Sequence, residues 1–362
     1  MLSEEYAMLK KEIIGLMSGT SLDGLDVVLV EFNCTKGQNT FKLKQKRTIP
    51  YPTKLQTEIK NAESLNLANF QILDKKIGSF FGDTVNQFIK DYEIDKKNIA
   101  AIASHGQTIL HQPENGFTLQ IGCGSTIAYN TGINVINDFR TLDVISGGQG
   151  APLVPIGDFD LFETKADAFL NIGGFCNISF KKNNFISAFD VCPGNLPLNS
   201  FAKKMGFEYD DRGKFAQQGT LNPILLKRLN SLEFYQQKNP KSLGTEWLNT
   251  SFYPLIPNED KSENILKTIS VHIAQQVSHI LNENQLNTVL LTGGGAKNDY
   301  LVNEIKNLYS GKVVIPDEEI IDFKEAIIFA YLGYKYLLET TNNVPSVTGA
   351  GKCLRMGVLH TP

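Results

Sequence analysis

Apolar residues follow two patterns along this chain. Short apolar runs bounded by polar turns are typical of strands, and longer stretches with apolar residues every three or four positions are typical of helices. In the first part of the chain these patterns predict strands at residues 13–17, 27–32, 42–49, 99–104 and 133–138, and helices at residues 69–92 and 122–131. The first three strands therefore precede a long helix. One face of that helix carries Leu73, Ile77, Phe80, Phe81, Val85, Phe88 and Ile89.

The order of three strands and a helix returns in the second part of the chain. There the patterns predict strands at residues 168–172, 176–180, 185–190, 288–291 and 313–316, helices at residues 196–205, 221–232, 261–284, 299–309 and 322–339, and a polar loop at 210–220. A recurring element order indicates internal duplication. A chain of 362 residues is long enough for two cores. We expect an α/β protein with one domain at residues 1–138 and 344–362 and another at 139–343, joined through the glycine-rich segment 138–155.

Composition excludes several classes of function. The chain is 42% hydrophobic and 20% charged with a net charge of −3, so it has no basic footprint for nucleic acid or an anionic membrane surface. It contains no run of about 18 apolar residues that could span a bilayer. Its five cysteines are scattered and include no CxxC pair, which favours reduced thiols in a cytoplasmic protein over a disulfide framework or a zinc site.

The turn between the first two strands is the first candidate site. Glycine lets a backbone approach a ligand, hydroxyl groups donate hydrogen bonds, and carboxylates bind a metal ion or a sugar hydroxyl. These residue types all occur in the turn, at Ser18, Gly19, Thr20, Ser21, Asp23, Gly24 and Asp26. We therefore predict a phosphate-binding hairpin, although the same composition is also found in ordinary polar turns.

Asp190 is the predicted general base. It ends a strand and precedes Pro193, Gly194 and Asn195, so its carboxylate is expected to face a cleft and accept a proton from an attacking hydroxyl or water. The alternative is a helix cap, but Asn195 is better placed to cap the helix predicted to begin near residue 196. Cys192 has no evident histidine partner and is expected to be an inert thiol.

Other polar and glycine-rich segments follow predicted strands. His105 lies in a polar cluster after one strand, Arg140 lies in the glycine-rich crossing, and Glu325 is expected near the start of the last long helix, where the helix dipole alone favours an acid. Glycine turns at 173–174 and 293–295 also follow strands, a geometry that accepts phosphate. No GxGxxG or GxxxxGK[ST] sequence accompanies them, which argues against a dehydrogenase and against a Walker A loop.

Together these motifs resemble the anhydro-N-acetylmuramic acid kinases of the sugar kinase, Hsp70 and actin superfamily. The matching segments include GLMSGTSLDGLD at 15–26, ASHGQTILHQP at 103–113, LQIG at 119–122, NDFRTLDVISGGQGAPLVP at 137–155, LNIGGFCNIS at 170–179, FDVCPGN at 189–195, LTGGGAKN at 291–298, KEAIIFAYL at 324–332 and PSVTGA at 345–350. They run nearly end to end, in order. The resemblance implies two duplicated actin-like (ribonuclease H-like) domains flanking a central nucleotide cleft, and a homodimer.

The resemblance also implies an activity. Such kinases phosphorylate O6 of 1,6-anhydro-N-acetylmuramic acid with MgATP and open the anhydro ring with water, giving N-acetylmuramic acid 6-phosphate in peptidoglycan recycling. By resemblance Asp190 is the catalytic aspartate, Asp23 is a candidate for holding Mg²⁺, and His105, Arg140 and Glu325 contact the sugar. ATP would be bound by Gly19, Thr20, Ser21, Leu22, Asp23, Gly24, Leu25, Asp26, Gly173, Gly174, Gly293, Gly294 and Gly295.

The sequence departs from the family pattern next to the predicted base. The family usually has DTGPGN followed by an aspartate, whereas this chain has Val191, Cys192 and, at the later position, Asn199. Two alternatives therefore stay open. One is a kinase for another 1,6-anhydrosugar such as levoglucosan, and the other is a non-catalytic relative that binds sugar or nucleotide.

Overall fold

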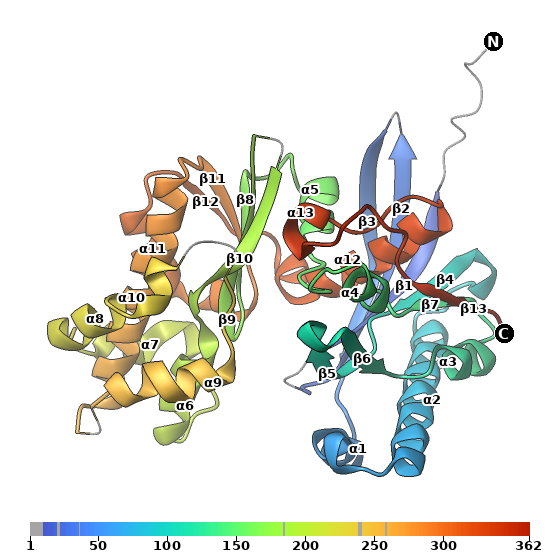
Figure 1. Ribbon diagram of the computed structural model, residues 1–362, viewed down its shortest axis with the longest axis horizontal. Coiled ribbons are helices and arrows are strands. Elements are labelled where there is room, and N and C mark those ends of the chain that lie inside the picture. Colours follow the sequence, from blue (N-terminus) through green and yellow to red (C-terminus); the bar gives the residue numbers. More distant parts are fainter. Residues whose placement is uncertain (1–9, 20–21, 36, 184, 238–240, 258) are drawn as a thin grey trace. The chain divides into compact units, whose positions relative to one another are not determined.

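The computed structural model describes residues 10–19, 22–35, 37–183, 185–237, 241–257 and 259–362 (Figure 1). The chain divides into two compact units, unit 1 at Met1–Leu161 and Phe323–Pro362, and unit 2 at Phe162–Asp322. The chain passes from unit 1 to unit 2 after residue 161, later than the predicted boundary at 138/139. It returns to unit 1 after residue 322, earlier than the predicted boundary at 343/344. Long-range packing explains the difference, because helix α5 (Pro155–Leu161) is tied to helix α12 (Glu318–Leu337) within unit 1 by the buried ion pair of Asp158 and Lys324.

Unit 1 is built on a six-stranded sheet with the order β13-β7-β4-β1-β2-β3. Its strands are β1 (Lys11–Ser18), β2 (Leu25–Thr35), β3 (Gln38–Ile49), β4 (Ile99–Ser104), β7 (Val135–Asn137) and β13 (Val358–His360). β1, β2 and β3 form an antiparallel meander, and β4 and β7 continue parallel to β1. Because β1 and β4 run parallel, the residues that follow Ser18 and Ser104 emerge at the same edge of the sheet.

Helices cover one face of the unit 1 sheet. These helices are α1 (Thr53–Lys60), α2 (Leu67–Asp91) and α3 (Gly124–Thr131). The predicted stripe of α2 is confirmed, since Ile77, Phe81 and Val85 are fully buried against apolar side chains of β1 and β2. Asn66 caps α2 by accepting a hydrogen bond from the Asn69 N–H at 2.9 Å.

Helix α12 packs on the other face of this sheet with almost no space between backbones. A Cβ atom added at Gly15 in β1 would lie 2.3 Å from the Ala326 carbonyl oxygen, and one added at Gly333 would lie 2.6 Å from Cβ of Ala103 in β4. Phe32 of β2 stacks on Tyr334 of α12, with ring centres 5.1 Å apart. These contacts fix the position of α12 along β1 and β4, and with it the side chains in its first turns.

Unit 2 repeats the strand order of unit 1. Its sheet has the order β10-β9-β8-β11-β12, formed by β8 (Ala168–Ile172), β9 (Phe175–Lys182), β10 (Phe185–Pro193), β11 (Thr288–Thr292) and β12 (Lys312–Val314). Again three antiparallel strands are followed by two strands parallel to the first. This is the topology of ribonuclease H-like domains, and it confirms the predicted α/β fold class and the duplication.

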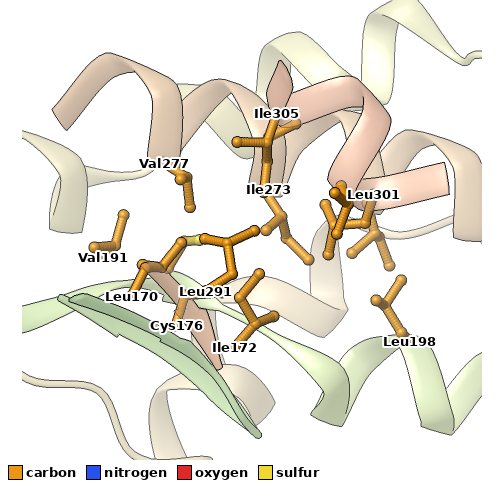
Figure 2. Close-up of a cluster of buried hydrophobic side chains, with 14 of the residues drawn as sticks. Leu170, Ile172, Cys176, Val191, Leu198, Ile273, Val277, Leu291, Leu301 and Ile305 are labelled. Atoms are coloured by element: carbon orange, nitrogen blue, oxygen red, sulfur yellow. The ribbon is translucent and has the colours of Figure 1, made fainter. Parts of the chain in front are cut away.

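The core of unit 2 lies between this sheet and the helices α10 (Ser262–Glu283) and α11 (Asp299–Leu308) (Figure 2). Leu170, Ile172 and Leu291 project from β8 and β11 toward Ile273 of α10 and Ile305 of α11. The alternating strands and the stripe of α10 thus bury their apolar residues against one another, as their sequence patterns predict.

Several elements differ from the sequence prediction. The polar loop expected at 210–220 contains α7 (Lys214–Gln218), because the Asp210 carboxylate accepts hydrogen bonds from the N–H groups of Phe215 and Ala216. Further elements are the hairpin β5 (Gln107–Gln112) and β6 (Phe117–Ile121), and the helices α4 (Thr141–Ile145), α6 (Asn195–Lys204), α8 (Pro223–Asn230), α9 (Thr245–Trp247) and α13 (Pro345–Thr348). Within the described ranges, none of the helices is both long and apolar enough to cross a membrane.

Candidate active site

Asp190 lies near the C-terminal end of β10 in unit 2, half-buried. Its Oδ2 atom accepts a hydrogen bond from the Leu243 N–H at 2.8 Å, and its own N–H donates to the Lys241 carbonyl at 2.9 Å. Burial raises the pKa of Asp190, and the Leu243 N–H partly offsets this by stabilising the charged carboxylate. A carboxylate held in this way can act as a proton acceptor near neutral pH.

The strand is irregular at this point. The pairing register of β10 with β9 shifts between Asp190, which lies opposite Asn177, and Cys192, which lies opposite Cys176. Val191 and Cys192 are both buried, and Figure 2 shows Val191 among the core side chains. Burial raises the pKa of the Cys192 thiol, which fits the inert thiol predicted from the sequence.

The turn at Gly173 and Gly174 is bound to the segment that follows β10. The N–H groups of Gly194 and Asn195 donate to the carbonyls of Gly174 and Gly173, both at 2.8 Å. The prediction that Asn195 caps a helix is wrong. Gly194 occupies the cap position of α6, and the Asn195 amide instead donates to the Ile172 carbonyl at 3.0 Å. Asn195 therefore links the end of β8 to the start of α6.

The second glycine turn of unit 2 lies against the first. A Cβ atom added at Gly293, which has a φ of +78°, would lie 2.7 Å from the Ile172 carbonyl oxygen. One added at Gly295 would lie 2.1 Å from Cγ2 of Ile172, and one added at Gly294 would lie 3.4 Å from Nδ2 of Asn195. β8 and β11 run parallel, so both turns leave the same edge of the sheet. The structure thus brings Gly173, Gly174, Gly293, Gly294 and Gly295 together. Glycine at these positions lets the two turns approach each other without a side chain between them.

The hairpin turn of unit 1 connects Ser18 to Leu25, which pair across β1 and β2. Leu22 adopts a positive φ of 59°, its side chain is buried, and its carbonyl accepts a hydrogen bond from Nε2 of Gln56 at 2.8 Å. Gly19 closes the turn by accepting from the Leu22 N–H at 3.3 Å. Thr20 and Ser21 lie outside the described residues.

The two aspartates of this turn have different surroundings. Asp23 is exposed. Asp26 accepts a hydrogen bond from Oγ1 of Thr48 in β3 at 2.5 Å. Gly24 lies against β3, where an added Cβ would be 2.7 Å from the Ile49 carbonyl oxygen. Asp23 is therefore the more accessible carboxylate of the two.

His105 and Arg140 form a direct pair in unit 1. Nε and Nη2 of Arg140 lie 3.1 and 2.9 Å from Nε2 of His105, and Nη1 donates to the Gly150 carbonyl at 2.7 Å. Burial, reinforced by the charge of Arg140, lowers the pKa of His105 to about 3, and burial lowers the pKa of Arg140 to about 10. His105 is therefore a neutral imidazole that accepts hydrogen bonds from a charged guanidinium.

Glu325 belongs to the same group of side chains. The expectation that it begins the last helix is wrong, because α12 starts at Glu318 and Glu325 lies two turns inside it. Burial raises the pKa of Glu325, while the charges of Lys324 and Arg140 act in the opposite direction. The helix dipole does not account for an acid at this position, since its effect is confined to the first turn.

Sequence reasoning missed how the loop around Arg140 is held. Asp143 is fully buried, and its carboxylate accepts hydrogen bonds from the Gly150 N–H at 2.8 Å, from Oγ1 of Thr348 at 2.8 Å and from Nδ2 of Asn343 at 3.2 Å. Asp143 is thus an anchor that joins this loop to the C-terminal segment, and it does not face a cleft. The pairing of Leu243 with Asp190 was also missed, because a backbone N–H leaves no signal in residue type.

Comparison with known proteins identifies the relatives of this chain. The family model of anhydro-N-acetylmuramic acid kinases matches residues 11–362. A protein with that description from Francisella tularensis subsp. novicida (strain U112) is 36% identical over 375 residues, covering 97% of this chain and 98% of that protein. One from Bacillus cereus (strain G9842) is 35% identical over 378 residues, covering 97% and 99%. Among solved structures, the chain is similar to component A of (R)-2-hydroxyglutaryl-CoA dehydratase from Acidaminococcus fermentans, with a TM-score of 0.47 and 11% sequence identity. The alignment covers 88% of this chain and 95% of that chain, and the likeness is too weak to inform function.

Proposed function

This chain belongs to the anhydro-N-acetylmuramic acid kinase family, and on that premise we propose that it phosphorylates O6 of 1,6-anhydro-N-acetylmuramic acid with ATP. Water opens the anhydro bridge at C1 in the same reaction, and the product is N-acetylmuramic acid 6-phosphate. The enzyme would serve peptidoglycan recycling, which fits the family's name. It would act in the cytoplasm, where ATP is available.

The observation that carries the proposal is the environment of Asp190. A half-buried carboxylate with a raised pKa, held at Oδ2 by one N–H donor, can accept the proton of a water molecule attacking C1. As the C1–O6 bond breaks, the electron pair stays on O6, which attacks the γ-phosphorus of ATP while the bond from that phosphorus to the β-phosphate oxygen breaks and ADP leaves. The negative charge of O6 thus passes through the phosphoryl group to ADP, so neither a free alkoxide nor a separate acid for O6 is required.

The polar group of unit 1 supplies donors and acceptors for a sugar. Arg140 is a cation held in place by its contacts with His105 and the Gly150 carbonyl, and Glu325 can accept hydrogen bonds from hydroxyl groups. We propose that His105, Arg140 and Glu325 contact the sugar. The carboxylate of the lactyl group in the proposed substrate gives a guanidinium a matching charge.

Backbone N–H groups of the glycine turns are proposed to bind ATP. In unit 1 these belong to the turn from Gly19 to Asp26, which includes Thr20, Ser21, Leu22, Gly24 and Leu25. In unit 2 they belong to the adjoining turns at 173–174 and 293–295. Rigid turns of this kind suit phosphate, because successive N–H groups converge on one anion.

The residues of unit 1 fit a Mg²⁺ ion that is bound with ATP. In the part of the chain that the structure describes, no group of three or more His, Cys, Asp or Glu side chains could form a metal site of its own. Mg²⁺ is usually held by one or two carboxylates together with substrate phosphates, and the exposed carboxylate of Asp23 can serve as such a ligand. When bound, Mg²⁺ would neutralise charge on the transferred phosphoryl group.

The departures from the family pattern next to Asp190 are compatible with this proposal. Val191 and Cys192 are buried among core side chains of unit 2. Their substitution therefore changes packing behind the base and leaves the carboxylate itself and its Leu243 donor in place. The proposed base is therefore unchanged, and the substrate panel below decides between the family's substrate and another anhydrosugar.

The test is to incubate the protein with MgATP and 1,6-anhydro-N-acetylmuramic acid in ¹⁸O-labelled water and to analyse the product by mass spectrometry. We expect one ¹⁸O atom at C1 and none in the phosphate ester at O6. A control sample of N-acetylmuramic acid 6-phosphate in the same water measures label that enters by exchange at the reducing carbon. Absence of product, while a curated relative is active alongside, would refute the proposal.

Substitution of the base separates catalysis from binding. Asp190→Asn should lower kcat by about 10²- to 10⁴-fold, the usual contribution of a general base, and leave ATP binding unchanged. Asp83→Asn, at an exposed position on α2, is the matched control and should retain full activity.

A substrate panel that includes levoglucosan tests substrate choice, and light scattering tests the homodimer that the resemblance implies.

A further inference from the structure

The segment at residues 241–243 lies alongside β10, which is first in the strand order of the unit 2 sheet. The Lys241 carbonyl accepts the Asp190 N–H at 2.9 Å, and two residues later the Leu243 N–H donates to Oδ2 of the same aspartate at 2.8 Å. One short segment thus binds both the backbone and the side chain of the proposed base.

Lys241 is the residue that fixes this segment to the rest of unit 2. Its Nζ atom donates to the Phe234 carbonyl at 3.1 Å and lies 4.4 Å from the centre of the Phe234 ring and 5.8 Å from that of Tyr235. Tyr235 in turn is hydrogen-bonded through its hydroxyl to Nε2 of the buried His272 on α10, at 2.7 Å. The anchor therefore connects the segment to the longest helix of unit 2.

We propose that Lys241 is a positioning residue for the base. It holds the 241–243 segment in the register at which the Leu243 N–H donates a hydrogen bond to the Asp190 carboxylate. The inference rests on the proposed role of Asp190. Phe234 provides the Lys241 ammonium with a carbonyl acceptor and an aromatic face, and the Tyr235 ring lies next to the same ammonium. The side chain of Lys241 does not need to touch the carboxylate to control it.

The direction of the effect follows from the hydrogen bond. A donor to the charged carboxylate lowers its pKa, and burial raises it, so losing the Leu243 donor leaves burial unopposed. Titratable groups nearby include the thiols of Cys192 on β10 and Cys176 on β9, the Tyr235 phenol and the Lys241 ammonium. The charge of Glu283 on α10 also acts on Lys241. Opposite Asp190 on β9 stands the neutral Asn177.

The first experiment removes the donor. Leu243→Pro deletes the N–H, and Ser242→Pro is the matched control, since Ser242 is exposed and proline there stiffens the same segment and keeps that N–H. The pKa of Asp190 is measured by carboxyl ¹³C NMR on the full chain, with the signal assigned through Asp190→Asn. We expect Leu243→Pro to raise the pKa of Asp190 by about one pH unit, the order given by loss of one charge-assisted hydrogen bond, and Ser242→Pro to leave it near the wild-type value.

The second experiment removes the anchor. Lys241→Met keeps the apolar stem and deletes the charge, and Lys241→Arg restores a cation that can stack on Phe234. We expect Lys241→Met to shift the acidic limb of the kcat/KM profile to higher pH, so that activity on that limb falls up to tenfold, with the KM for ATP unchanged and with recovery in Lys241→Arg. Lys227→Met, at an exposed lysine on α8, should behave as wild type.

The outcomes separate this inference from the proposed function. If the wild-type protein transfers no phosphate, the function fails, and the NMR titration still decides whether the segment controls the carboxylate. If a folded Leu243→Pro or Lys241→Met variant keeps the wild-type pKa of Asp190, the inference is overturned. If neither variant folds, the inference is tested on the wild-type protein by following the NMR chemical shift of the Leu243 amide proton as the pH changes. That shift should titrate with Asp190, and a shift that is constant with pH overturns the inference.

Discussion

The buried ion pair of Asp158 and Lys324 gives the sharpest stability prediction. The two charged atoms are 2.9 Å apart, and each side chain is only 4% exposed. Lys324→Met removes the cation and leaves a carboxylate in a site closed to water. Breaking a buried pair from one side costs about 3–5 kcal/mol.

This cost converts to a temperature shift. Unit 1 has about 200 residues. For a domain of that size, 1 kcal/mol lowers the melting temperature by about 2–4 °C, so Lys324→Met should lower it by roughly 6–20 °C. Differential scanning calorimetry measures the shift. The exposed pair of Lys76 and Glu58 supplies the control, and Lys76→Met should cost less than about 1 kcal/mol.

A double variant tests the reasoning itself. Asp158→Leu combined with Lys324→Met removes both charges and should recover most of the lost stability, because the penalty arises from breaking a buried ion pair from one side. The argument is refuted if Lys324→Met melts within 2 °C of wild type, about the effect of the exposed control. It is also refuted if the double variant is less stable than Lys324→Met alone, since packing would then outweigh charge.

Three further predictions concern titration, packing and thiol chemistry. Burial lowers the pKa of His272 to about 3, so the unfolded chain binds its proton first as the pH falls. The contribution of His272 to stability is present above about pH 6.5 and falls by roughly 2 kcal/mol between pH 6.5 and 5. Because the pKa of His105 is lowered in the same way, urea titrations at pH 7 and 5 should show a loss of stability in both proteins that is roughly 2 kcal/mol smaller in His272→Gln than in wild type. Phe81→Ala, at a fully buried position on α2, should cost about 3–5 kcal/mol in the same assay, and a cost below about 1 kcal/mol would contradict the packing described. Burial opposes ionisation of Cys123, but hydrogen bonds from Lys75 and Thr126 lower its pKa overall. Lys75→Met should therefore slow the alkylation of Cys123 by iodoacetamide at pH 7 several-fold, and an unchanged rate would contradict the hydrogen bond from Lys75.

The strand pattern of both units was predictable from the sequence. Strands such as β4 and β8 carry apolar residues on both faces, and the long helices bury a stripe of regular spacing, so short windows of sequence contain the information. The domain division was not predictable in this way. It depends on Asp158 contacting Lys324 across 166 positions, and nothing in either local sequence indicates the partner.

The residues proposed for the site could be chosen by residue type, and their contacts could not. Asp190, His105 and Arg140 were identified because charged or polar residues after strands are informative. The role of Asn195 was misjudged and that of Asp143 was missed, because whether a side chain caps a helix, bridges two turns or anchors a loop depends on neighbours far away in the chain. Backbone donors such as the Leu243 N–H are invisible to residue type altogether.

The contact between β1 and α12 has a consequence for how mutational scans of this protein are read. Gly15 and Gly333 leave no room for a methyl group against Ala326 and Ala103. Even alanine at either position would force the helix away from the sheet and displace Glu325 with it. In a library screened for activity, both glycines would therefore tolerate substitution as poorly as a catalytic residue. Only a parallel measurement of protein abundance would reveal that substitution there disrupts the close packing of α12 on the sheet.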